Sequence, residues 1–184
     1  MSADGGALET LVARYAEART LQQLDACARA YEQAGAPKSA SWPKIRLALT
    51  GNYSTQFLAR GFPVALAARE FAAEIYETPY NQWRAEMLDS ASALYAFSPT
   101  HLVLTLTSIE LAYGALRSPD VLVGTIAAAI KAALQASDAH ILITLPEPLA
   151  DEISDNCAAY AWRLAVNAGS VSYTHLRAHE TGRN

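Results

Sequence analysis

The spacing of apolar residues changes near residue 44 and divides the chain into two unequal parts. Residues 7–34 carry apolar side chains at helical spacing. Thr20 followed by Gln23 has the form of a capping box, so we expect two consecutive helices here, the second beginning after Thr20. Gly35 would end the second helix, because glycine accepts the left-handed conformation of a C-terminal cap.

After residue 44, short apolar runs alternate with helical patterns. This alternation is typical of parallel strands joined by right-handed crossovers, with helices on both faces of the sheet. The sequence therefore predicts a three-layer α/β/α domain with a parallel sheet over residues 44–170, preceded by a helical appendage and linker over residues 1–43. The predicted strands are residues 45–50, 72–77, 101–107 and 140–145, and the predicted helices are residues 54–70, 80–89, 119–136 and 151–167.

The last residues of the chain, 171–184, break this pattern. They have no periodicity and contain His175 and His179, two of the four histidines. The string 171–181 resembles the translation of a transposase-type sequencing adaptor. Two histidines four residues apart on a helix can hold a metal ion, but a segment of adaptor origin is excluded from reasoning about the fold. We therefore expect a non-native tail, and a natural domain that continues beyond residue 170.

Composition and charge narrow the classes of function. The 184 residues are 52% hydrophobic and 17% charged, as in a folded domain with a well-filled core. The net charge is -4 and the chain has no basic run, so neither nucleic acid nor a membrane surface is expected as a partner. Cys27 and Cys157 lie far apart, which fits reduced thiols, and Met1 is not followed by a secretory leader. We expect a cytoplasmic protein without a metal site.

The loop after the first predicted strand is the expected place for a ligand. In open parallel sheets, ligands bind beyond the carboxyl ends of the strands, where the strand order reverses. The loop leads into a helix N-terminus, whose free N–H groups favour an anion. Either the loop holds a phosphate, or its hydroxyls only cap the helix, and we prefer capping by Ser54 or Thr55. The candidate ligand-binding residues are Gly51, Asn52, Tyr53, Ser54 and Thr55.

Ser54 is a weak candidate for a catalytic nucleophile. A nucleophilic serine needs a histidine base that a carboxylate orients. His101 and His140 each open a predicted strand, so both are expected at the amino edge of the sheet, opposite the loop. No spacing pairs the carboxylates near strand ends as an acid and a base; these are Glu74, Glu77, Glu110 and Glu147.

Three aromatic residues follow the second predicted strand, namely Tyr76, Tyr80 and Trp83. They could line a pocket over the loop, or they could cover the edge of the sheet. We prefer the second interpretation, since large aromatic side chains serve packing more often than recognition.

Three stretches of sequence together resemble one protein family. They are residues 51–58, residues 75–83 (IYETPYNQW) and residues 94–99 (LYAFSP). They are similar to the N-terminal domain of FkbH-like proteins, also described as haloacid-dehalogenase (HAD) superfamily subfamily IIIC, from about Lys44 to Asn167. The resemblance implies an SGNH-hydrolase-like, flavodoxin-like fold, and together with the alternation it predicts strand order 2-1-3-4. It also implies a following phosphatase-like domain that opens with Asp-x-Asp and uses Mg²⁺. Better-understood members load a glyceryl unit from a phosphorylated glycerate onto an acyl carrier protein for polyketide assembly.

The same resemblance argues against esterase activity in this chain. SGNH esterases have a Gly-Asp-Ser block with the serine as nucleophile, and Gly51, Asn52 and Tyr53 stand in those places. Residues 107–110 replace the Gly-x-Asn-Asp block, and the second-block glycine has no counterpart. The 184 residues contain no Asp-x-Asp.

We therefore expect a truncated, non-catalytic N-terminal domain of an FkbH-like enzyme. Glyceryl or acyl transfer to an acyl carrier protein, or related phosphatase chemistry, would belong to the missing domain, and Mg²⁺ with it. The alternatives are an SGNH-type ester hydrolase that uses Ser54, and a flavodoxin-like binder of phosphate or a cofactor. Because a fifth strand would be missing, strand four should be an edge, with Ile141, Leu142 and Ile143 still covered by helices.

Overall fold

A computed structural model of the chain describes residues 3–35, 41–107 and 119–144. The expectations for the helix over 151–167, for the tail over 171–184 and for Cys157, Glu110 and Glu147 lie outside these residues. The described elements, in chain order, are α1 (Ala3–Glu17), α2 (Leu21–Gln33), β1 (Lys44–Gly51), α3 (Gln56–Ala67), β2 (Ala72–Glu77), α4 (Trp83–Leu88), α5 (Ala93–Ala96), β3 (His101–Thr105), α7 (Pro119–Ala136) and β4 (His140–Thr144).

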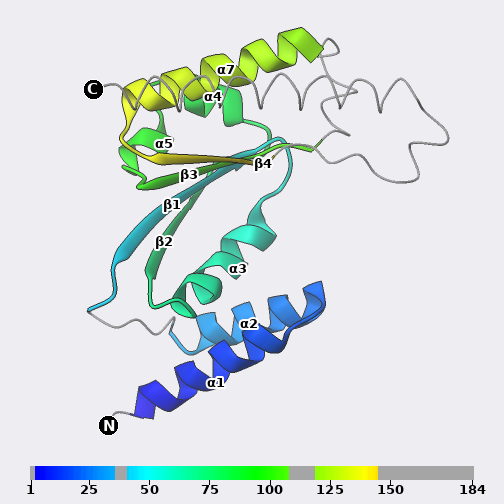
Figure 1. Cartoon of the computed structure of the whole chain (residues 1–184), viewed down its shortest axis with the longest axis vertical. Helices are drawn as coiled ribbons and strands as arrows, with labels where there is room; N and C mark the ends of the chain where they lie inside the picture. The colour runs from blue at the N-terminus through cyan, green and yellow to red at the C-terminus, as the bar shows by residue number, and fades with distance from the viewer. Residues whose placement is uncertain (1–2, 36–40, 108–118, 145–184) are drawn as a thin grey trace, which may run out of the picture.

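The described strands form one parallel sheet in the order β2-β1-β3-β4, as predicted (Figure 1). The chain moves in one direction along the sheet from β1 to β2 and in the other direction from β2 to β3 and β4. Right-handed crossovers that run in opposite directions place their helices on opposite faces. Accordingly, α3 lies on one face, and α4, α5 and α7 lie on the other. The predicted α/β class is confirmed.

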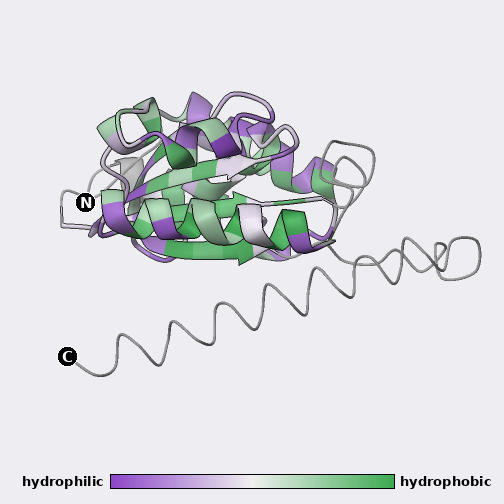
Figure 2. Ribbon diagram, turned by 90° about the horizontal axis from the view of Figure 1, so that it is seen from above, coloured by the Kyte–Doolittle hydropathy of each residue, from purple (hydrophilic) through white to green (hydrophobic). Residues whose placement is uncertain are grey.

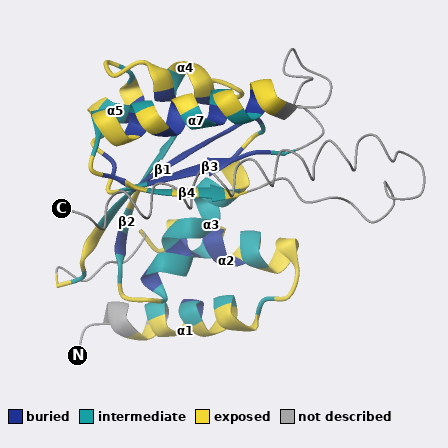
Figure 3. Ribbon diagram, turned by 45° about the horizontal axis from the view of Figure 1, so that its top comes forward, coloured by how far each residue is buried: buried dark blue, intermediate teal, exposed yellow. Residues whose placement is uncertain are grey.

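Each face of the sheet has its own apolar layer. On the α3 face, Leu47, Leu49 and Val103 pack with Leu58 and neighbouring side chains. Figure 2 shows hydrophobic residues in the strands and in the helices that cover them, and Figure 3 shows buried residues along β1 and β3. This matches strands that are covered on both faces. The larger layer, on the opposite face, includes Ala48, Trp83, Met87, Leu94, Leu102, Leu104, Leu122 and Ile126.

The two N-terminal helices pack on α3. The predicted capping box is confirmed, since the Gln23 backbone N–H donates to Thr20 Oγ1 at 3.2 Å and the Thr20 N–H donates to Gln23 Oε1 at 3.1 Å. Gly35 has a φ of 78°, as expected after the end of α2. The shared core of the three helices is Leu11, Ala28, Tyr31, Val64 and Ala67.

Three elements in the middle of the chain are shorter than predicted, and the first is the helix expected over 54–70, which spans only Gln56–Ala67. The helix expected over 80–89 begins only at Trp83, and a second short helix, α5, follows it. The strand expected over 101–107 ends at Thr105. Thr107 leaves the ladder because its backbone N–H donates to the side chain of Asn52 at 2.8 Å.

The expectation that helices cover Leu142 is wrong. This side chain is 54% exposed, whereas Ile141 and Ile143 on the opposite face pack against the larger core. Leu142 lies on the face of the sheet that α3 covers. However, α3 packs against β2, at the edge of the described sheet opposite β4. No described helix therefore lies over β4 on this face. Within the described residues β4 pairs only with β3, which makes it an edge of the described sheet.

Candidate functional site

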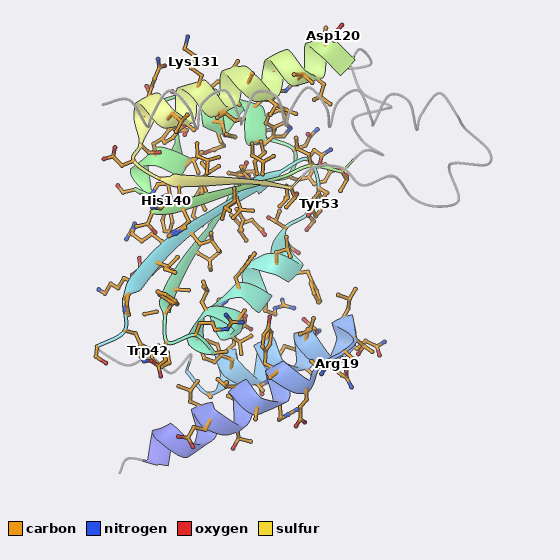
Figure 4. All side chains as sticks on the ribbon, viewed as in Figure 1. Arg19, Trp42, Tyr53, Asp120, Lys131 and His140 are labelled. Carbon is orange, nitrogen blue, oxygen red and sulfur yellow. The ribbon has the colours of Figure 1, made fainter. Side chains whose placement is uncertain are left out.

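The loop after β1 and the residues after β2 enclose a pocket of about 220 Å³ at the carboxyl ends of the strands. Figure 4 labels Tyr53 at this end of the sheet. The pocket is smaller than typical sites for small molecules, which begin at about 300 Å³. Its lining is Tyr53, Ser54, Thr55, Gln56, Glu77, Thr78, Pro79 and Tyr80.

Gly51 and Asn52, the first two candidate residues of the loop, do not line this pocket. A Cβ atom on Gly51 would lie 2.3 Å from the carbonyl oxygen and 2.5 Å from the hydroxyl of Thr105 on β3. Real side chains never approach backbone so closely, so glycine is required where β1 and β3 meet. Gly51 therefore serves the packing of the sheet.

Asn52 joins the ends of β1 and β3 through its buried side chain, which is only 1% exposed. Its Nδ2 donates to the Thr107 carbonyl oxygen at 2.9 Å, and its Oδ1 accepts from the Thr107 N–H at 2.8 Å. The amide thus satisfies both backbone groups of a residue that has left the ladder, which is what a buried polar group requires. An aspartate at this position would have no N–H for the carbonyl.

Thr55 occupies the N-cap position of α3, but it does not cap the helix. Its hydroxyl donates to Glu77 Oε2 at 2.7 Å instead. The backbone of Thr55, at φ -94° and ψ 2°, is not in the extended conformation from which N-cap side chains reach the following N–H groups. The expectation that Ser54 or Thr55 caps α3 is therefore wrong, since no side-chain capping bond is present.

The charge at this pocket does not suit a phosphate. The described residues that line it include the carboxylate of Glu77 and no lysine or arginine. Glu77 also contacts Thr55 at the N-terminus of α3, where the helix dipole favours a negative charge. The protein's own carboxylate thus lies where a bound anion would be expected.

Ser54 is exposed, and no described histidine lies near it. His101 and His140 begin β3 and β4, as predicted, and are paired with each other at the amino end of the sheet. The five residues of β3 separate that end from the loop, a distance of about 13 Å at the usual rise per residue. The described residues therefore give Ser54 no general base.

The three aromatic residues in and after the end of β2 lie in different surroundings. Trp83 is 1% exposed and belongs to the main core, whereas Tyr80 is 59% exposed and lines the pocket. Tyr76 stacks on Phe97, with ring centres 5.5 Å apart, and its O–H donates to Glu86 at 3.3 Å. Burial, and then the charge of Glu86, raise the pKa of Tyr76. Only one of the three thus belongs to the pocket.

Sequence reasoning missed Arg46, which organises the turn before β3. Its guanidinium lies 4.4 Å from the centre of the Phe97 ring and donates to the carbonyl oxygens of Phe97 and Ser98. It also forms an ion pair with Glu74 at 2.7 Å. Ser98 has a φ of 52°, a turn conformation that the two carbonyl contacts help to hold. A single arginine inside an apolar strand was the available signal.

The described residues show no group of three or more His, Cys, Asp or Glu side chains that could hold a metal ion. The two acidic residues of β2 already have partners, since Glu74 pairs with Arg46 and Glu77 accepts from Thr55. This donor set does not fit Mg²⁺, which prefers several free oxygen ligands. None of the helices in the described part of the chain combines the length and hydropathy that crossing a membrane requires.

The fold is that of a doubly wound α/β domain. In it, much of the loop after β1, where the strand order reverses, serves packing. Residues 46–118 match the family model described as "FkbH, N-terminal domain". The resemblance inferred from the sequence is therefore confirmed over these residues, which begin at Arg46 and include Asn52, Trp83 and Phe97. No curated protein matches the chain.

One solved structure with the same fold is the N-terminal part of the protein BF1531 from Bacteroides fragilis. That crystal structure is described as containing a phosphatase domain complexed with Mg. The two structures agree with a TM-score of 0.62 at 16% sequence identity, over 90% of this chain and 43% of the other. This chain thus spans less than half of that structure, and the likeness shows the fold alone.

Proposed function

We propose that this chain is the N-terminal, non-catalytic domain of an FkbH-like enzyme of the HAD superfamily. A phosphatase-like domain that follows it would carry the chemistry, with Mg²⁺, and would transfer a glyceryl or acyl unit to an acyl carrier protein in the cytoplasm. This domain would position the carrier protein or the substrate for that step.

The observation that carries the proposal is the way in which the loop is built into the sheet. Gly51 leaves no space for a side chain against Thr105, and the polar groups of Asn52 are used by Thr107. Ser54 has no described base, so the parts of a hydrolytic site are not brought together.

The similarity to known proteins supports the same proposal. The match over residues 46–118 is to a domain described as N-terminal, which supports an FkbH-like domain followed by further chain. The B. fragilis structure of the same fold contains a phosphatase domain and Mg in addition.

The proposal is tested by extending the gene beyond codon 170 and expressing the longer product. We expect an Asp-x-Asp sequence soon after that point. The longer protein should hydrolyse p-nitrophenyl phosphate in the presence of Mg²⁺, and replacing the first of those aspartates by asparagine should abolish this activity. A continuation without Asp-x-Asp would overturn the proposal.

The transfer step needs a second measurement. The longer protein, incubated with a phosphorylated glycerate and an acyl carrier protein, should add the mass of one glyceryl unit to the carrier. Hydrolysis of phosphate esters without any such mass increase would support the phosphatase activity and contradict transfer to the carrier protein.

A further inference from the structure

His101 and His140 lie side by side at the amino end of the sheet, away from the pocket. They are directly paired in the register of β3 and β4, so both side chains project from the same face. Their ring centres are 5.2 Å apart and the ring planes are inclined by 40°. Figure 4 labels His140 at the opposite end of the sheet from Tyr53. His140 is exposed and His101 is half-buried, so solvent reaches the pair.

Thr100 holds this pair in place through its backbone. Its carbonyl oxygen accepts from the His140 N–H at 2.9 Å, and its own N–H donates to the Arg46 carbonyl oxygen at 2.9 Å. The residue before His101 is thus hydrogen-bonded to β1 on one side and β4 on the other. Both histidines begin their strands at a fixed point, which limits the movement of their Cα atoms.

The Thr100 hydroxyl also contacts the His101 ring. Its oxygen accepts from the Arg46 N–H at 3.0 Å and lies 3.3 Å from the Arg46 carbonyl oxygen. The same oxygen lies 2.9 Å from His101 Nδ1. In the tautomer with the proton on Nδ1, this N–H donates to Thr100 and Nε2 keeps its lone pair for a ligand. Histidines that bind metals characteristically donate their second ring N–H in this way.

We propose that His101 and His140 together bind one Zn²⁺ ion, with water in the remaining coordination positions. With Zn–N bonds of about 2.0–2.1 Å, about 1.1 Å from nitrogen to ring centre and an angle of about 109°, two imidazoles on one ion have centres about 5.2 Å apart. The observed separation of the ring centres is 5.2 Å. Neutral imidazole suits Zn²⁺ among the divalent cations, whereas Mg²⁺ and Ca²⁺ prefer oxygen ligands.

The two-imidazole arrangement is independent of the non-catalytic role proposed above, because it lies at the other end of the sheet.

The test is a calorimetric titration of the 184-residue chain with Zn²⁺. All variants carry His175→Ala and His179→Ala, because these two histidines could bind the ion by themselves. We expect this background protein to bind one Zn²⁺ per chain. His140→Gln, an exposed substitution that leaves the core intact, should weaken binding by more than about 100-fold, beyond the roughly 10–100-fold cost of losing an outer-shell partner.

Absence of Zn²⁺ binding in the background protein would overturn the proposal, and so would binding that His140→Gln leaves unchanged. His101→Ala provides the second ligand test, with circular dichroism to show that the variant is folded. Thr100→Val should weaken Zn²⁺ binding by about 10–100-fold, and Thr100→Ser, which keeps the hydroxyl, should restore it. Equal Zn²⁺ binding by the Val and Ser variants would show that the Thr100 hydroxyl does not position His101.

Discussion

At the scale of single residues, much of the loop after β1 is explained by packing. Gly51 lets β1 and β3 approach each other, and Asn52 replaces the ladder bonds that Thr107 gives up. Ser54 is exposed, while Thr55 gives its hydroxyl to Glu77. Polar residues in a loop at a reversal of strand order can therefore serve the fold rather than a ligand.

Replacing Gly51 by alanine should destabilise the protein. The added methyl group would lie 2.3 Å from a backbone oxygen that cannot move without breaking the sheet, so we expect a loss of about 3 kcal/mol in the free energy of unfolding. Gly124→Ala is the matched control, since nothing lies within 4 Å of its Cβ in α7. It should raise stability by about 0.5–1 kcal/mol. Urea denaturation measures both, and equal stabilities would contradict this account of Gly51.

The place of the candidate site could be predicted from the sequence, but the role of each residue could not. The site lies after β1 because the alternation of strands and helices fixes where the strand order reverses. The role of Asn52 depends on the point at which Thr107 leaves β3, a long-range contact that no local pattern records. The role of Arg46 likewise depends on a long-range contact, with the turn at Phe97, which the sequence of β1 does not show.

At the scale of elements, the N-terminal helices are joined to the sheet through α3. Besides the apolar contacts, Asp25 on α2 accepts from Arg29 at 2.7 Å and from Arg60 on α3 at 3.0 Å. These hydrogen bonds, first from Arg29 and then from Arg60, lower the pKa of Asp25 below its usual value. The link between α2 and α3 therefore depends on an ionised carboxylate.

This ion pair gives the stability a predictable dependence on pH. Because the pKa of Asp25 is lower in the folded state, the stabilisation is complete above the unfolded value, about 4, and is lost as the pH falls through the folded value. Asp25→Asn should lower the melting temperature at pH 7, and the difference from the wild type should shrink below pH 4. Asp138→Asn, at an exposed position, is the control. A difference that stays constant down to pH 3 would contradict the assignment.

β4 presents Leu142 to solvent on the α3 face of the sheet, at a place that α3 does not reach. Leu142→Thr keeps the β propensity of the strand and removes an exposed leucine, so we expect less aggregation on heating and a change in unfolding free energy within about 0.5 kcal/mol. Leu104→Thr, at a fully buried position of β3, should instead destabilise the protein strongly. Light scattering and urea denaturation report the two effects, and strong destabilisation by Leu142→Thr would show that this side chain is covered.

At the scale of the whole molecule, the sheet separates two regions with different chemistry. Its carboxyl end carries the small pocket beside Glu77, and its amino end carries the histidine pair. The α/β class was predictable because each apolar run is short and is followed by a helix, and the strand order was predictable from this pattern together with the family resemblance. The exposure of Leu142 was not predictable, since the sequence does not state how far α3 extends across the sheet.

The central claim is that this domain does not itself hydrolyse esters, and one measurement tests it most directly. The 184-residue chain and its Ser54→Ala variant are assayed with p-nitrophenyl acetate at neutral pH, with the buffer rate as baseline. Because no described histidine can activate Ser54, we predict that both proteins release p-nitrophenol at the same low rate, without turnover. Multiple turnovers by the wild-type chain that Ser54→Ala abolishes would contradict the claim and identify the domain as an ester hydrolase.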